Sequence, residues 1–111
     1  MKKVYLANAL SLQMFDLSQS TDLHIFPMSI GSVREFSRDG IKFESAIGHP
    51  DTAAVVSDLV GQEVEARRIS IKLTDDDMLI VAQLVGGRLP EGATRLPDGF
   101  ELKFFGVSIK K

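Results

Sequence analysis

The chain has 111 residues, of which 44% are hydrophobic and 25% charged, and its formal net charge is −2 at pH 7. This composition predicts one globular domain over residues 1–111 with a core of its own. The absence of cysteine excludes disulfides, zinc fingers and thiol catalysis, and the slightly acidic balance argues against a protein that coats duplex DNA. A small anionic ligand stays possible, because a few arginines in one cleft are enough to hold it.

Three segments of the first half alternate apolar and polar side chains with the period of a β-strand. They are "KVYLAN" (3–8), "DLHIFPM" (22–28) and "IKFESAI" (41–47). Pro27 predicts that the second strand ends there or lies at an edge of the sheet, since proline cannot donate to a strand ladder. Between the strands, "ALSLQMF" (9–15) predicts a turn of helix, and "GSVREFSRDG" (31–40) predicts a short helix or a loop.

The second half predicts a helix, further strands and one long loop. The helix begins at Pro50, which suits the first helical position, and stops at Gly61. "VEARRISIKL" (64–73) predicts a long strand that turns at "TDDD" into a hairpin partner, "MLIVAQLV" (78–85). After the loop at 86–99, "FELKFFGVSI" (100–109) predicts the last strand. We therefore expect an α/β domain, with a mixed β-sheet flanked by short helices.

His49 occupies the position just before this helix, where serine, aspartate or asparagine would cap better. Two interpretations stay open. His49 can be a polar residue that caps the helix weakly. Alternatively, it is a proton donor at a helix N-terminus, where free N–H groups and the dipole attract a phosphate.

Other charged residues offer weaker signals. Residues 75–77 are three consecutive aspartates, which predict a solvated turn and no metal site, because neighbours in a turn point apart. Arg67 and Arg68 are neighbours in a predicted strand, so only one of them can line a cleft. The long loop carries Arg88 and Glu91, and it is either a flexible connection or a functional lid.

Three segments taken together resemble a known family. They are "KVYLANALSLQM", "SAIGHPDTAAVVSDLVG" and "RRISIKL…LIVAQLVGGRLPEG", in order and in register over roughly residues 2 to 96. The chain thus resembles the type III anti-CRISPR ring nucleases, a family of small viral and bacterial proteins. The resemblance implies a homodimer that binds one cyclic tetra-adenylate across its two-fold axis. It also implies that this messenger is cut to linear di-adenylates without a metal or cofactor, which silences type III CRISPR signalling.

The resemblance implies a role for seven residues. The catalytic positions are His49, Arg88 and Glu91, and the substrate-binding positions are Asn8, Ser11, Arg68 and Gln83. Gln83 matches only if one residue is inserted before Arg88. The chain departs from the family at Pro50, where an acidic residue is usual, and at Gly86–Gly87, where bulkier polar residues are usual and where the glycines are expected to loosen the lid.

The chemistry implied by the resemblance suits these residue types. In RNA a ribose 2′-hydroxyl can attack the adjacent phosphate, so the protein must offset phosphate charge and protonate the departing 5′-oxygen. Two other classes stay open: a sponge or sensor that binds a cyclic nucleotide without turnover, and a plain protein-interaction module.

The location expected is cytoplasmic, in the host cell if the gene is viral. No segment reaches the roughly 18 consecutive apolar residues of a membrane helix, so we expect no membrane partner. The net charge of −2 argues against duplex nucleic acid as a partner. Viral and host origin are equally compatible with the sequence.

Overall fold

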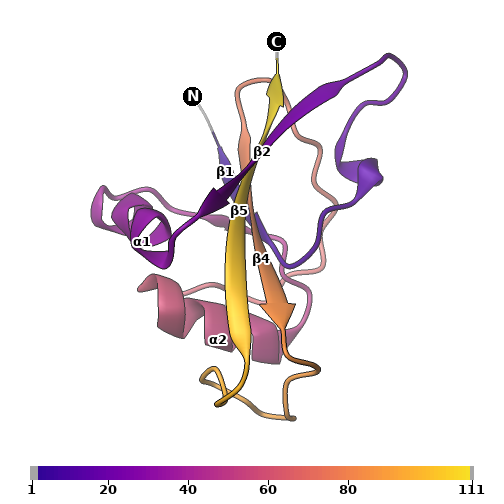
Figure 1. The fold of residues 1–111 in the computed structure, drawn as a ribbon. Coiled ribbons are helices and arrows are strands. Elements are labelled where there is room, and N and C mark those ends of the chain that lie inside the picture. The colour runs from indigo at the N-terminus through magenta and orange to yellow at the C-terminus, as the bar shows by residue number, and fades with distance from the viewer. Residues whose placement is uncertain (1–2, 111) are drawn as a thin grey trace.

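The computed structural model describes residues 3–110, so Met1, Lys2 and Lys111 of the predicted 1–111 domain lie outside the described part. Five strands form one mixed sheet in the order β2-β5-β4-β1-β3, and two α-helices accompany it (Figure 1). The predicted fold class is confirmed. The elements are β1 (Val4–Ala7), the 3₁₀ turn η1 (Leu12–Met14), β2 (Asp22–Met28), α1 (Ile30–Arg38), β3 (Glu44–Ser45), α2 (Pro50–Val60), β4 (Met78–Val85) and β5 (Glu101–Lys110).

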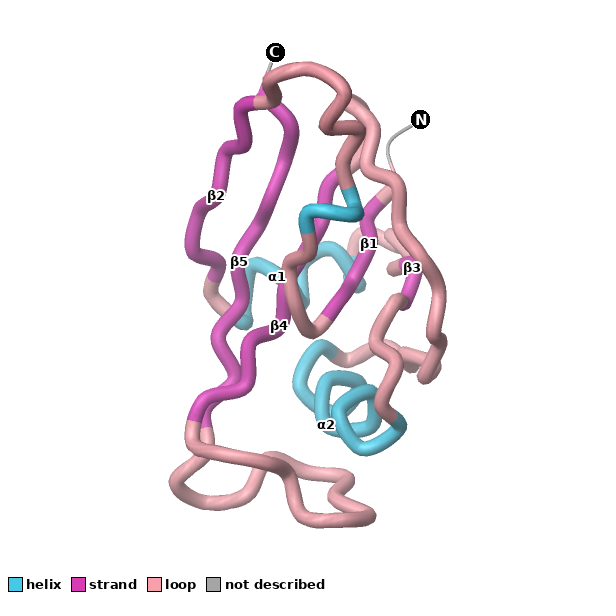
Figure 2. The backbone as a smooth tube through the Cα atoms, turned by 90° about the vertical axis from the view of Figure 1, so that its right-hand side faces the viewer, coloured by secondary structure: helices cyan, strands magenta, loops and turns pink. Residues whose placement is uncertain are grey.

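Strand β4 lies at the centre of the sheet. It is parallel to β1 and antiparallel to β5, and β1 is also parallel to β3. The almost continuous apolar run of β4 suits a strand that is covered on both faces. Because β1, β3 and β4 run in the same direction, their carboxyl ends lie together at one end of the sheet. Helix α2 and the long loop lie at that end (Figures 1 and 2).

Both helices cover one face of the sheet. Val33 of α1 and Val56 and Val60 of α2 are buried, and they pack in one cluster with Ile80 of β4 and Phe104 of β5. The arginines of α1 and Asp58 of α2 are exposed, as expected for amphipathic surface helices. In the described part of the chain, neither helix has the length and apolar character that crossing a bilayer would need.

The opposite face is covered by irregular segments. Phe15, Ile71 and Leu73 are buried there against Leu79 of β4 and Val107 of β5. Figure 2 shows these segments as long pink stretches beside the strands. The sheet is therefore a central layer between two helices on one side and loops on the other.

The predicted strand over 64–73 is wrong. The segment has no strand structure, although Ile71 and Leu73 are buried as the alternation implies. The same alternation places Ile69 on the face of Ile71 and Leu73, but Ile69 is 39% exposed. The backbone N–H of Leu73 donates to the carbonyl of Met14 (2.7 Å), which lies outside the sheet. The predicted hairpin between residues 64–73 and β4 is also wrong, because β4 already pairs with β5 on one side and β1 on the other.

The strand predicted over 41–47 is shorter than expected. Only Glu44–Ser45 pair with β1. The Gln62 amide replaces a further neighbour strand, since its nitrogen donates to the Ile41 carbonyl (2.9 Å) and its oxygen accepts from Phe43 N–H (2.9 Å). One side chain thus satisfies the backbone groups that a longer ladder would have used.

Strand β2 is an edge strand, as Pro27 predicted. Pro27 lies opposite Phe105 of β5, and the next pair is Phe26 with Gly106. A Cβ atom on Gly106 would overlap the Phe26 ring, so this glycine makes room for an aromatic side chain that lies across it. The absence of a side chain at Gly106 is therefore a packing requirement.

The three aspartates of the predicted solvated turn divide into two groups. Asp75 and Asp76 are exposed, but Asp77 is only 7% exposed. Its carboxylate accepts hydrogen bonds from Thr74 N–H (3.0 Å), the Thr74 hydroxyl (2.9 Å) and Lys3 N–H (3.3 Å). Asp77 therefore closes the turn and ties it to the amino end of β1.

Candidate functional site

His49 begins helix α2 with its backbone alone. Its backbone is extended, and its carbonyl accepts the first helical hydrogen bond from Ala53 N–H (3.0 Å). The imidazole makes no capping hydrogen bond, and the residue is exposed. Pro50 follows at the first helical position, as predicted. The imidazole is thus positioned at the helix N-terminus without serving as a side-chain cap.

The predicted catalytic residues lie around one cavity of about 840 Å³, which we call the His49 cavity. Three separate parts of the chain form it: the first turn of α2, the end of β4 and the long loop. Its lining residues are His49, Pro50, Asp51, Thr52, Leu84, Arg88, Leu89 and Glu91. The structure therefore brings His49, Arg88 and Glu91 together, although about forty residues separate the histidine from the loop. This position at the carboxyl ends of parallel strands is where open α/β sheets bind ligands.

The loop over 86–100 leaves the sheet through a glycine pair. Gly86 and Gly87 have φ of 118° and 124°, a region that favours glycine. A Cβ on Gly86 would lie 3.0 Å from the Gly99 carbonyl oxygen and 3.1 Å from Phe100 Cα, so the two ends of the loop pack closely together. Gly86 therefore closes the base of the loop, whereas the sequence led us to expect a looser lid.

Arg68 lies beside the backbone that precedes His49. Its Nε donates to the Gly48 carbonyl (3.3 Å), and a Cβ on Gly48 would lie 3.0 Å from Arg68 Cγ. Arg67 points elsewhere and forms an exposed ion pair with Glu44 (3.6 Å). The two neighbouring arginines thus contact different parts of the chain, and Arg68 is the one beside the residue that precedes His49. Arg68 does not line the His49 cavity but lies next to it.

Asn8 and Ser11 follow the carboxyl end of β1. Because Leu6 of β1 pairs with Ser45 of the parallel strand β3, Asn8 and Gly48 follow their strands at the same end of the sheet. Asn8 is exposed. The Ser11 hydroxyl accepts a hydrogen bond from Gln13 N–H (3.3 Å) and caps η1, so it also has a structural role. Among the described residues, neither of the two lines the His49 cavity.

Gln83 lies on the opposite face of the sheet from the His49 cavity. Side chains alternate along β4, and the next residue, Leu84, lines the cavity. Gln83 pairs with Lys103 of β5 and is exposed. The insertion that its match required is consistent with this separation, and Gln83 does not join His49 within one copy of the chain.

Sequence reasoning missed five lining residues of the His49 cavity, which are Pro50, Asp51, Thr52, Leu84 and Leu89. Pro50, Asp51 and Thr52 form the first helical turn after His49, and Leu89 follows Arg88, so these neighbours of predicted residues could have been indicated. Leu84 had no signal, because its place depends on how β4 passes α2. The cavity thus contains one arginine and two carboxylates, Asp51 and Glu91, and Arg68 adds a second cation beside it.

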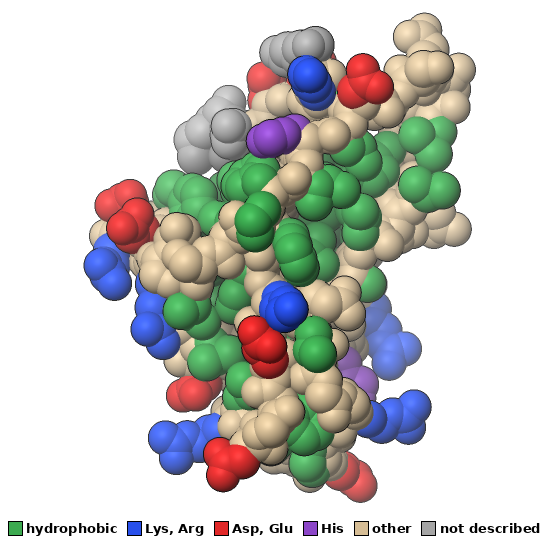
Figure 3. Space-filling model, in the orientation of Figure 1, with side chains coloured by type: hydrophobic (Ala, Val, Ile, Leu, Met, Phe, Trp, Pro, Cys, Tyr) green, Lys and Arg blue, Asp and Glu red, His purple; other side chains and the backbone are tan. Residues whose placement is uncertain are grey.

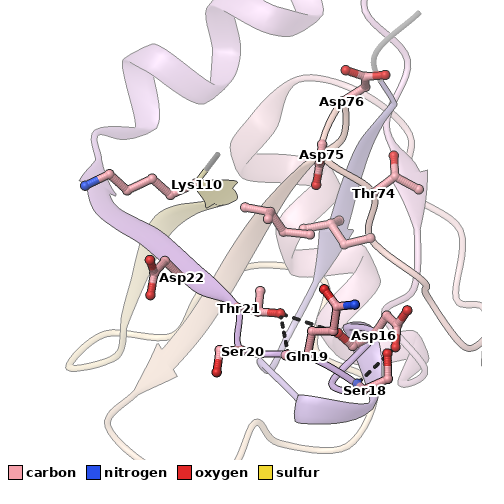
Figure 4. A pocket seen from close by; sticks show the side chains of 12 residues that line it. Asp16, Ser18, Gln19, Ser20, Thr21, Asp22, Thr74, Asp75, Asp76 and Lys110 are labelled. Atoms are coloured by element: carbon pink, nitrogen blue, oxygen red, sulfur yellow. Dashed lines mark hydrogen bonds between the residues drawn. The ribbon is translucent and has the colours of Figure 1, made fainter.

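A second hollow of about 740 Å³ lies at the other end of the sheet (Figure 4). Four carboxylates surround it with a single cation, and they come from three segments of the chain without converging on one point. They are Asp16, Asp22, Asp75 and Asp76, and the cation is Lys110. Hydrogen bonds from Ser18 lower the pKa of Asp16, so that carboxyl favours its charged form. Over residues 3–110 no three acidic, histidine or cysteine side chains are grouped as metal ligands. An anionic ligand therefore favours the His49 cavity over this one.

Comparison with known proteins supports the fold. The protein B116 of Sulfolobus turreted icosahedral virus (STIV) has a similar structure, with a TM-score of 0.73 and 24% sequence identity. The similarity covers 96% of this chain and 98% of B116, and at this identity it shows the fold alone. No curated protein matches the chain. The family model described as STIV B116-like matches residues 4–107. The chain therefore belongs to the STIV B116-like family, which is named after a viral protein.

Proposed function

We propose that the protein is a metal-independent ring nuclease. It binds cyclic tetra-adenylate across a homodimer and cleaves it to linear di-adenylates, which switches off type III CRISPR signalling. One observation carries the proposal: His49, Arg88 and Glu91, from two distant parts of the chain, line the same cavity at the start of α2. The sequence resemblance described above supplies the substrate and the reaction.

The reaction needs a nucleophile, a proton acceptor and a proton donor. The ribose 2′-oxygen attacks the neighbouring phosphorus, the bond from phosphorus to the 5′-oxygen breaks, and a 2′,3′-cyclic phosphate and a 5′-hydroxyl result. His49 donates the proton to the departing 5′-oxygen. Its imidazole is available for this task because it is exposed and makes no capping hydrogen bond. Glu91 is the acceptor on the loop side of the cavity for the proton of the 2′-hydroxyl.

The phosphate charge is offset from two directions. The free N–H groups in the first turn of α2 face the cavity that contains His49. Arg88 lines the cavity from the loop, and Arg68 lies beside its rim next to Gly48. One copy of the chain thus supplies two arginines, and two copies supply one cation for each phosphate of a cyclic tetranucleotide.

Exposed leucines favour the homodimer. The segment after β1 has three of them, and Leu10, Leu12 and Leu17 are 41%, 69% and 52% exposed. Clusters of exposed apolar side chains mark contact surfaces. Hydrophobic side chains also lie along the face formed by β2 and β5, although a basic and an acidic side chain lie among them near the middle of the view (Figure 3). Asn8 and Ser11 belong to the leucine-bearing segment, so a second copy packed on it brings both residues to a shared site.

The test is incubation with radiolabelled cyclic tetra-adenylate in EDTA, with products separated on a gel. We expect linear di-adenylate from the wild type. His49→Ala should slow single-turnover cleavage by about 10²–10⁴-fold, the usual contribution of general acid–base catalysis, and change binding only a few-fold. His24→Ala is the matched control, because His24 stacks on Phe26 (ring centroids 5.1 Å apart) in the edge strand β2.

Each outcome selects one class of function. Cleavage that depends on His49 supports the nuclease. A retarded band with unchanged substrate would mean a sponge or sensor, and neither binding nor product would mean an interaction module. Equal loss in both histidine variants would contradict the role of His49.

A further inference from the structure

The long loop over 86–100 is tied to α2 at its tip. Inside the loop, Ala93 N–H donates to the Pro90 carbonyl (3.1 Å), which forms a turn. At that turn, Gly92 N–H donates to Oδ2 of Asp51 (3.2 Å). Among residues 3–110, this is the only hydrogen bond in which a loop group donates to a side chain outside the loop. The turn lies between Arg88 and the end of the loop and includes Glu91.

Local geometry leaves this bond with little support from packing. Gly92 has φ of 77°, and a Cβ atom there would meet nothing within 4 Å, so the tip is not packed at this point. The base of the loop is closed by Gly86, but the tip lies several residues away from it. Asp51, in contrast, is held in the first turn of α2 behind Pro50. A firmly placed carboxylate thus holds an open turn.

We infer that Asp51 is a positioning residue, whose carboxylate holds the loop tip so that Arg88 and Glu91 face His49. The inference rests on the proposed function for its effect on catalysis, but the hydrogen bond itself can be tested without substrate. The carboxylate also brings negative charge to a cavity intended for phosphates. An acidic residue at this position is explained if the site needs the acceptor oxygen and not the charge.

Two substitutions separate the hydrogen bond from the charge. Asp51→Asn keeps an oxygen that can accept from Gly92 N–H and removes the charge. Asp51→Ala removes both. Asp58→Ala is the matched control, since Asp58 is an exposed aspartate on the same helix, outside the His49 cavity. A structural role of charge on α2 would affect both alanine variants, whereas the loop tether would affect only one.

The first experiment is limited trypsin digestion of the folded protein without ligand, with fragments identified by mass spectrometry. Cleavage after Arg88 and Arg95 reports opening of the loop. We expect Asp51→Ala to accelerate these two cleavages by about two- to tenfold, the size expected for one lost hydrogen bond. Asp51→Asn and Asp58→Ala should digest like the wild type. Uniform acceleration at all sites, including Arg38 on α1, would mean general destabilisation and would overturn the inference.

The second experiment is single-turnover cleavage of cyclic tetra-adenylate over a range of protein concentrations. For Asp51→Ala we expect half-saturation at about two- to tenfold higher protein concentration, because binding must then order the loop. The rate at saturation should change less than about twofold, and Asp51→Asn should restore the wild-type half-saturation. Equal defects in both Asp51 variants would assign the effect to charge and overturn the tether.

The two experiments fail separately. If the wild type does not cleave the substrate, the proposed function fails, and the digestion still decides whether Asp51 holds the loop. If the wild type cleaves the substrate but trypsin digests Asp51→Ala like the wild type, the inferred role of Asp51 is wrong and the proposed nuclease function is unaffected.

Discussion

Asp77 offers a test of the fold that needs no ligand. Its buried carboxylate accepts three hydrogen bonds, two from Thr74 and one from Lys3 N–H, and it joins the turn before β4 to the amino end of β1. Asp77→Ala leaves these three donors without their partner. At about 1 kcal/mol net for each bond, the variant should lose about 2–4 kcal/mol of the free energy of unfolding. That is a large part of the roughly 5–15 kcal/mol that stabilises a typical domain.

The same carboxylate predicts a dependence on pH. Burial by itself would raise the pKa of Asp77, but the hydrogen bonds from Thr74 and Lys3 outweigh it, and the pKa is lowered. A lowered pKa in the folded state means that Asp77 stabilises the fold fully above its unfolded pKa of about 3.9. This stabilisation is lost as the pH falls through the folded pKa. The difference between wild type and Asp77→Asn should therefore be largest near neutral pH and shrink in acid.

The assay is urea unfolding followed by far-ultraviolet circular dichroism, because the chain has no tryptophan. Asp77→Asn keeps one acceptor oxygen and should lose about 1–2 kcal/mol. Asp75→Asn, an exposed neighbour in the same turn, should stay within about 0.5 kcal/mol of the wild type. An Asp77→Ala variant as stable as the wild type, or a difference that grows in acid, would refute this account of the turn.

Three further predictions use the proposed function and the packing. Arg68→Ala and Arg88→Ala should each weaken binding of cyclic tetra-adenylate about ten- to hundredfold by calorimetry, since a charge-assisted hydrogen bond contributes roughly 1.5–3 kcal/mol. Arg38→Ala should change little, and equal effects in all three would indicate a diffuse field. Gly106→Ala should cost about 1–3 kcal/mol in urea unfolding because a methyl group overlaps the ring that covers this position. Gly31→Ala, where a Cβ meets only Ser29 Oγ at 3.7 Å, is its control. Light scattering should show a dimer at micromolar concentration, and an active monomer would contradict the shared site.

Much of the fold could be predicted because its signals are local. The alternation in β1 and β2, the apolar run of β4, and the pair of Pro50 and Gly61 around α2 each act within a few residues. Pro27 indicated an edge strand because a missing N–H has the same consequence in any sheet. His49 could be recognised as a candidate for the same reason, since the free N–H groups at the start of α2 follow from the helix alone.

The partners of each segment were decided only by the tertiary structure. The pattern in 64–73 is that of a strand, and yet the segment stays outside the sheet, because β1 and β5 already flank β4. The Gln62 amide took over backbone groups at 41–43 that the alternation assigned to a strand. The predicted strands over 64–73 and 41–47 both rested on alternating apolar side chains. Burial of such side chains does not distinguish a paired strand from a loop that covers the sheet.

The candidate site divides in the same way. The sequence by itself determined that His49 begins a helix and that Arg88 and Glu91 belong to a glycine-bounded loop. Only the tertiary structure decided that this loop returns to α2, that Asp51 holds its tip, and that Gln83 faces away. Helices and turns are set by interactions between residues a few positions apart, which the sequence displays directly. Contacts between α2 and the loop depend on the order of the strands in the sheet, which is set by interactions along the whole chain.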